Sequence, residues 1–103
     1  MIDQTRLDEL RAEIGSEDLA EVIEMFCEEV EDALSKLDGT SFENTVERLH
    51  FLKGSALNIG LTSVSDLCRE EELRLREDPT APPDIDKIKS VYARTKPGLI
   101  DSL

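Results

Sequence analysis

Aromatic residues are scarce in this sequence, and long apolar runs are absent. Trp does not occur, and three Phe with one Tyr make up 4% of the 103 residues, so a core built from this sequence must be mainly aliphatic. No signal peptide and no apolar run approaching 18 residues is present. We therefore expect a soluble, cytoplasmic protein.

Basic residues and cysteines are also few. Twelve Lys and Arg stand against 24 Asp and Glu, which gives a net charge of −12, and no basic run or aromatic platform occurs. Nucleic acids and anionic membranes are therefore poor partners. Cys27 and Cys68 lie far apart on apolar helix faces and lack a C-x-x-C spacing. We interpret both as buried structural thiols and expect no metal site.

Apolar residues recur at spacings of three and four along most of the chain, and no strand pattern appears. A short helix is expected first, capped by Thr5 and ended by Gly15. The long predicted helices span residues 16–37, 41–59, 62–77 and 84–96. Short connections favour antiparallel neighbours, so we predict one all-α domain over residues 1–103, an up-down four-helix bundle with a short N-terminal capping helix.

Cap and turn residues mark the ends of these helices. Residues 40–43 have the pattern of a capping box, Gly60 provides a left-handed residue that stops a helix, and Asp84 can cap the last helix. Pro97 lies inside the apolar pattern of the last helix. We therefore expect a kink or an end near Lys96.

The single histidine lies on the helix predicted at residues 41–59, away from its core face. That face comprises Phe42, Thr45, Leu49, Leu52, Ala56 and Ile59. At roughly 100° per residue, the His50 side chain leaves the helix about 130° from the centre of this seam and should face solvent. Lys53 and Gly54 follow one turn later on the same side. A glycine inside a helix costs about 1 kcal/mol relative to alanine, which indicates space kept for the close approach of a partner.

The region around His50 carries the motif His-x-x-Lys-Gly-Ser at residues 50–55, and Gly60 closes the helix. This pattern resembles the signature of histidine-containing phosphotransfer (HPt) domains of two-component phosphorelays, and the likeness extends over about residues 10–75. The resemblance implies a four-helix bundle whose exposed histidine takes a phosphoryl group from a receiver-domain aspartate and hands it to another receiver. It also implies that Mg²⁺ and the rest of the catalytic apparatus belong to receivers of response regulators or hybrid histidine kinases, so we expect no cofactor on this chain.

Three side chains would act in such a transfer: His50 and two of its neighbours. His50 would be the phosphoryl acceptor, because neutral imidazole is a good nucleophile at its outer Nε2 atom. Lys53 would offset charge on the phosphoryl oxygens. Glu72, by its place in the family pattern, is the candidate acceptor for the other ring N–H, although Glu70 and Glu71 leave this assignment open by one position. The protein would then be a phosphohistidine intermediate rather than a self-sufficient enzyme.

Apolar residues beside His50 indicate a docking surface. Val46 and Leu57 point to the same half of the helix as the histidine, where they could contact a receiver. Ser55 belongs to the motif but lies about 140° from His50 around the helix, so we assign it to packing or to a bond with its own backbone. The sequence leaves open whether Phe51 is buried. It also leaves open why Glu71 occupies a position where the apolar stripe predicts an aliphatic residue.

Three other interpretations of His50 are possible. It could be a surface residue without a functional role. Glu47-x-x-His50 has the spacing of di-iron carboxylate bundles, but those need two such motifs and further inward-facing glutamates. The main alternative is a helical adaptor that binds signalling partners without being phosphorylated.

Overall fold

The computed structural model describes residues 2–37, 42–80 and 82–103, with the side chains of 42 and 43 left undescribed. The described residues form five α-helices and, apart from an isolated antiparallel bridge between Ile2 and Leu61, no β-structure. The helices are α1 (Gln4–Ile14), α2 (Ser16–Ser35), α3 (Phe42–Asn58), α4 (Thr62–Glu77) and α5 (Ile85–Asp101). The all-α class predicted from the sequence is confirmed. None of the described helices is long and apolar enough to cross a membrane.

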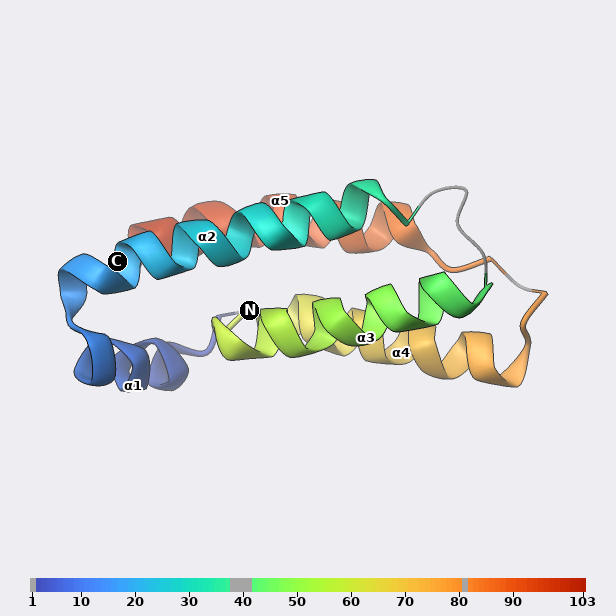
Figure 1. The fold of residues 1–103 in the computed structure, drawn as a ribbon, viewed down its shortest axis with the longest axis horizontal. Helices are drawn as coiled ribbons and strands as arrows, with labels where there is room; N and C mark the ends of the chain where they lie inside the picture. The colour runs from blue at the N-terminus through green and yellow to red at the C-terminus, as the bar shows by residue number, and fades with distance from the viewer. Residues whose placement is uncertain (1, 38–41, 81) are drawn as a thin grey trace.

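The four long helices lie along the long axis of the molecule, which measures 44 × 22 × 20 Å (Figure 1). α2 and α5 lie side by side, and α3 and α4 form a second pair. Contacts from α2 to α3 and from α4 to α5 join the two pairs, while α1 packs against α2 at one end. A single core therefore runs between the pairs.

The core is aliphatic, as the composition predicts. Its fully buried large side chains include Leu7, Leu19, Ile23, Val30, Leu49, Leu52, Val64, Ile88 and Leu99. Tyr92 is the only buried aromatic residue among the described side chains, and its hydroxyl donates to the Glu31 carboxylate at 2.7 Å and to the Cys27 carbonyl at 3.3 Å. Phe26 is half-buried and packs against the core.

Gly60 ends α3 in the way the sequence predicts. Its φ is +81°, its N–H donates to the Leu57 carbonyl, and the N–H of Leu61 donates to the Ala56 carbonyl at 2.8 Å. This pair of bonds is a Schellman motif, which satisfies carbonyls that a helix end leaves unpaired. α4 begins two residues later, so α3 and α4 become antiparallel neighbours.

The start of α1 differs from the prediction. Thr5 was expected to cap the helix, but Asp3 does so, because its carboxylate accepts from the Arg6 N–H at 3.1 Å. The N–H of Asp3 itself donates to the Gly60 carbonyl at 2.7 Å. This tertiary bond fixes the chain ahead of Thr5, and α1 therefore begins at Gln4.

The other helix ends lie within two residues of their predicted positions, except at the end of α5. Asp84 caps α5 as predicted, since its carboxylate accepts from the Lys87 N–H at 3.1 Å. The capping box predicted at residues 40–43 lies outside the part of the chain described in full.

Pro97 does not end α5, so the end predicted near Lys96 is wrong. The helix continues through the proline for a further turn. Pro97 is exposed, which leaves the carbonyl that loses its partner open to water. The last turn is held by Ser102, whose Oγ donates to the Gly98 carbonyl at 2.8 Å and whose own carbonyl accepts from Arg11 at 2.9 Å. These contacts offset the cost of the proline.

Replacing the proline should therefore stabilise the protein. Pro97→Ala restores a helical N–H at an exposed position and should raise the free energy of unfolding by about 1–3 kcal/mol. Urea unfolding followed by circular dichroism measures the change. Ala93→Pro, at an exposed site one turn earlier, is the matched control and should cost about 3 kcal/mol. An unchanged or lower stability of Pro97→Ala would contradict this account of the last turn.

Candidate functional site

His50 lies on the outer face of α3. Its side chain is 70% exposed, while the described seam residues of the same helix are buried. These residues are Thr45, Leu49, Leu52, Ala56 and Ile59. The predicted outward orientation of the histidine is confirmed. Phe42, the first predicted member of the seam, lies outside the described side chains.

A buried carboxylate from α4 lies beside the histidine. The Glu72 side chain is only 7% exposed, and its Oε1 lies 3.6 Å from His50 Nδ1, slightly beyond hydrogen-bond distance. Lys53 Nζ donates to Glu72 Oε2 at 3.0 Å, and Arg76 Nη2 donates to Oε1 at 3.2 Å. One carboxylate therefore joins the exposed histidine to two cations, one from α3 and one from α4.

These cations keep Glu72 ionised. Burial alone would raise the pKa of its carboxyl group, but hydrogen bonds from Lys53 and Arg76 and the charges of Lys53 and His50 more than offset this effect. The net result is a pKa below the usual value for glutamate. At neutral pH the group is a carboxylate, so it can accept a hydrogen bond from the imidazole but cannot donate one.

The neighbouring glutamates have different surroundings. Glu70 is exposed and has no ion pair within the described residues. Glu71 binds Arg74 and accepts from the backbone N–H of Asp84 at 3.1 Å. Glu71 thus links α4 to the start of α5, which explains a charged residue where the apolar stripe predicted an aliphatic one.

Arg76 is not among the site residues predicted from the sequence. Its contact with Glu72 joins residues four apart on one helix, a spacing at which side chains are neighbours. That spacing could have identified Arg76 once Glu72 had been chosen. Choosing Glu72 over Glu70 and Glu71 requires knowing how α4 is rotated against α3, and the sequence does not determine that rotation.

Contacts between α3 and α4 hold this site in place. Ser65 Oγ donates to the Lys53 carbonyl at 3.1 Å across the helix pair. Cys27 and Cys68 are free and buried, as predicted. Burial raises the pKa of the Cys68 thiol to about 12, so it stays neutral beneath the site.

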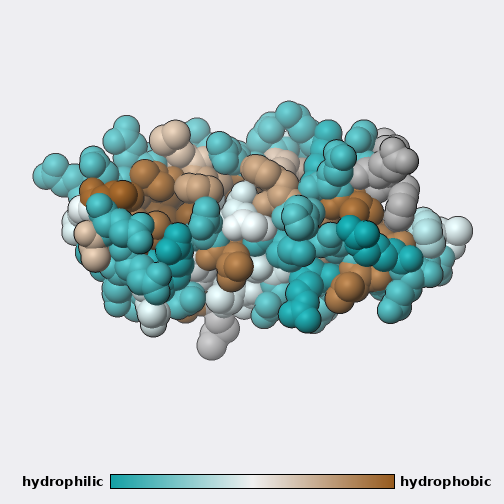
Figure 2. All heavy atoms as spheres, turned by 60° about the horizontal axis from the view of Figure 1, so that its bottom comes forward, coloured by the Kyte–Doolittle hydropathy of each residue, from teal (hydrophilic) through white to brown (hydrophobic). Residues whose placement is uncertain are grey.

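The surface around His50 is partly apolar. Leu57 is 56% exposed, Phe51 is 46% exposed and Val46 is half-buried. Figure 2 shows small groups of hydrophobic side chains on an otherwise hydrophilic face of the molecule. A Cβ atom added to Gly54 would meet nothing within 4 Å, so packing inside the protein does not require glycine there. Ser55 is buried, as a packing role requires.

The di-iron alternative does not fit this geometry. Glu47 and His50 are both exposed on the outside of α3. Di-iron carboxylate bundles hold their ligands in the interior.

Comparison with known proteins gives a family match and a partial relative. The family model of the Hpt domain matches residues 21–97. The phosphorelay intermediate protein YPD1 of Candida albicans is 39% identical over 51 residues, which cover 46% of this chain and 28% of that protein. The matched segment thus spans less than a third of the relative's length. No solved structure matches significantly.

The contacts of Glu72 predict a pH-dependent contribution to stability. Glu72→Gln removes the charge that Lys53 and Arg76 bind, and it should lower the free energy of unfolding at pH 7 by about 1–2 kcal/mol. Because the folded-state pKa of Glu72 is lowered, this contribution is present above the usual value of 4.5 and is lost as the pH falls through the folded-state pKa. Urea unfolding at several pH values should show the difference shrinking in acid.

The matched control for this experiment is Glu70→Gln. It removes the same charge from the same helix at an exposed position and should change stability little at any pH. An equal effect of both substitutions, or a constant effect of Glu72→Gln from pH 7 to acid, would contradict the electrostatic role of Glu72.

Proposed function

This chain belongs to the Hpt domain family, and on that premise we propose that it is a phosphorelay intermediate whose His50 accepts a phosphoryl group from a receiver-domain aspartate and passes it to another receiver. The observation that carries the proposal is the exposed imidazole whose Nδ1 lies beside the buried Glu72 carboxylate. That arrangement leaves the outer Nε2 atom pointing to solvent, where a partner can reach it. The partial match to a phosphorelay intermediate protein supports the same role.

In the proposed transfer, Nε2 of the neutral imidazole attacks the phosphorus of the receiver's aspartyl phosphate. A nitrogen–phosphorus bond forms while the bond from phosphorus to the aspartyl oxygen breaks, and the carboxylate leaves with the electron pair. The ring becomes positively charged because Nδ1 keeps its proton. The second transfer is the reverse of this step with a different receiver.

Glu72 stabilises the charged ring in this scheme. Its Oε1 is 3.6 Å from Nδ1, and a small movement of the exposed imidazole brings the pair within hydrogen-bond distance. The carboxylate would favour the tautomer with a proton on Nδ1, so that the lone pair lies on Nε2. The proposed role is therefore both orientation and charge stabilisation.

Lys53 and Arg76 would supply positive charge near the phosphoryl oxygens. Lys53 is one turn from His50 and its side chain is 29% exposed, so its ammonium is near the reacting atoms without being buried. Arg76 is 59% exposed and approaches the same carboxylate from α4. Both cations are held beside the histidine before any phosphoryl group arrives, which lowers the reorganisation that transfer requires.

The proposed receiver-docking surface consists of Val46, Gly54 and Leu57. Val46 and Leu57 lie on the side of α3 that carries His50, and the space above Gly54 is open. We also propose that residues 1–103 form one domain in which α2 to α5 make an up-down antiparallel bundle capped by α1. The contacts that link each long helix to the next, and α2 to α5, support this arrangement (Figure 1).

The first functional prediction identifies the acceptor. His50→Gln should fold with wild-type stability, because the side chain it replaces is 70% exposed, and should accept no phosphoryl group. Incubation with a labelled phosphorylated receiver, followed by a test for acid-labile, alkali-stable label, measures acceptance. Label of this type in the variant would mean that another residue is the acceptor. An unlabelled wild-type protein that still binds receivers would favour the adaptor alternative.

The second functional prediction concerns Gly54. Gly54→Ala should raise the free energy of unfolding by up to about 1 kcal/mol, because the helix gains propensity and the new Cβ meets nothing. Gly54→Leu should also fold. Both should slow transfer from a phosphorylated receiver, the leucine variant much more, because a larger side chain separates the reacting atoms.

Phosphorylation by a small donor provides the control for Gly54. Phosphoramidate needs no docking surface, so both variants should react with it at nearly the wild-type rate. Normal transfer between Gly54→Leu and its receiver would overturn the docking role, while unfolding of this variant would assign the glycine to packing.

A further inference from the structure

Charge is distributed unevenly over the four long helices. α2 carries eight carboxylates and no cation, whereas α5 carries four cations and only two carboxylates. In a chain with a net charge of −12, most of the surface repels an anionic partner. α5 is the long helix on which such a partner meets net positive charge.

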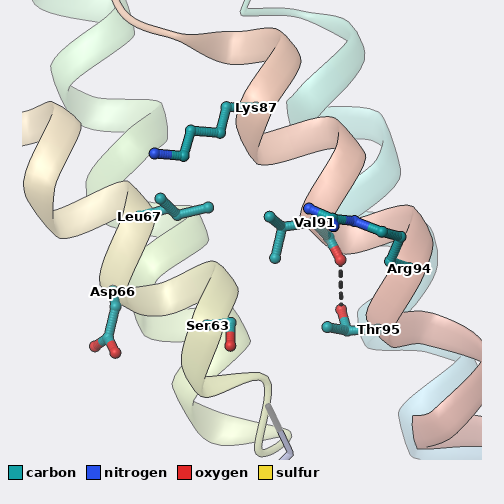
Figure 3. Close-up of a pocket in the computed structure, with 7 residues that line it drawn as sticks. All are labelled: Ser63, Asp66, Leu67, Lys87, Val91, Arg94 and Thr95. Atoms are coloured by element: carbon teal, nitrogen blue, oxygen red, sulfur yellow. Dashed lines mark hydrogen bonds between the residues drawn. The ribbon is translucent and has the colours of Figure 1, made fainter.

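A groove lies between α4 and α5, with a volume of ≈ 480 Å³ (Figure 3). Leu67 of α4 and Val91 of α5 are half-buried and form its apolar part. Figure 3 shows that Lys87 extends from α5 towards α4 near Leu67, while Arg94 lies along α5 beside Val91. The groove therefore combines an apolar floor with a cation near each end.

These two cations are not neutralised by neighbours. Neither Lys87 nor Arg94 makes an ion pair within the described residues, and Arg94 Nε donates only to the Ser90 carbonyl, at 3.4 Å. Asp66 is the one acidic residue that lines the groove, and Figure 3 shows its carboxylate pointing away from α5. Both positive charges are available to a partner.

We propose that this groove binds an acidic amphipathic helix of a partner protein. Lys87 and Arg94 are seven residues apart on one face of α5, or roughly 10.5 Å along its axis, which matches two carboxylates seven residues apart on a second helix. An apolar residue between those carboxylates would pack on Leu67 and Val91. None of the residues that line the groove is buried, so a small anion would remain largely in water, whereas a helix would cover the apolar floor.

This groove is separate from the site of His50. Leu67 and Glu72 differ by five residues on α4, so their side chains point about 140° apart around the helix axis. A partner in the groove would leave the imidazole open to a receiver. The proposal does not depend on the proposed phosphotransfer.

The test uses the full chain and a synthetic helical peptide of about 18 residues, with two glutamates seven residues apart and leucines between them. NMR shifts of the ¹⁵N-labelled protein should change in α4 around residues 63–67 and in α5 around residues 87–95. Lys87→Glu and Arg94→Glu should each weaken binding about fivefold, and added salt should weaken it further. Lys36→Glu makes the same charge change at an exposed site outside the groove and should leave the affinity for the peptide unchanged.

Several results would overturn the proposal. NMR shift changes centred on His50 would exclude it. Equal binding of a peptide with glutamines in place of its two glutamates would exclude it, and so would undiminished peptide binding by Lys87→Glu. Equal shifts in the groove with free glutamate at the same carboxylate concentration would indicate a small-anion site instead. Because His50→Gln should bind the peptide normally, loss of phosphotransfer and loss of groove binding remain distinguishable.

Discussion

The reversal of the chain at Gly60 determines which side chains can meet at His50. The positive φ of this residue stops α3, and α4 starts after one further residue, so the two helices pair along their length. That pairing brings Glu72 to His50 and Lys53, and it brings Ser65 to the Lys53 carbonyl. A Cβ at position 60 would lie 2.9 Å from the Asp3 carbonyl oxygen, so the turn requires glycine on steric as well as conformational grounds.

The second constraint is electrostatic. In the proposed transfer, a phosphoryl group on His50 would add negative charge to a chain that already carries −12. Nearby cations would offset this added charge, and the structure shows Lys53 and Arg76 bound to Glu72 beside the histidine. Hydrogen bonds from these cations offset the cost of burying the Glu72 carboxylate, and the carboxylate in turn fixes the positions of their charged groups. Each member of the group therefore depends on the others, as is common for a buried charge.

The features predicted correctly from the sequence are those that depend on position along one helix. The exposure of His50, the buried seam of α3 and the open space at Gly54 follow from angular spacing, which hardly depends on the neighbouring helices. The turn at Gly60 and the cap at Asp84 were also predictable, because their chemistry is local.

The features that the sequence left open, or predicted wrongly, depend on contacts between distant segments. Asp3 caps α1 in place of the predicted Thr5, and a bond from the Asp3 N–H to the Gly60 carbonyl fixes the chain at this point. Glu72 differs from Glu70 and Glu71 only through the rotation of α4 against α3. Pro97 is tolerated because the last turn of α5 has contacts beyond its own backbone. No pattern confined to one helix contains this information.

α4 forms one wall of both proposed sites, and its packing determines how strongly they can influence each other. The side of α4 between them is fixed in the core by Val64, Cys68 and Leu75, which are at most 3% exposed. A closely packed interior resists small displacements, and coupling between two sites needs an element with two alternative arrangements. The described part of α4 is one uninterrupted helix with its apolar side buried. We therefore expect α4 to keep one position when either site is occupied, rather than to move between two arrangements. On this basis, a helix bound beside Lys87 and a receiver bound at His50 would occupy one molecule together without changing each other's affinity.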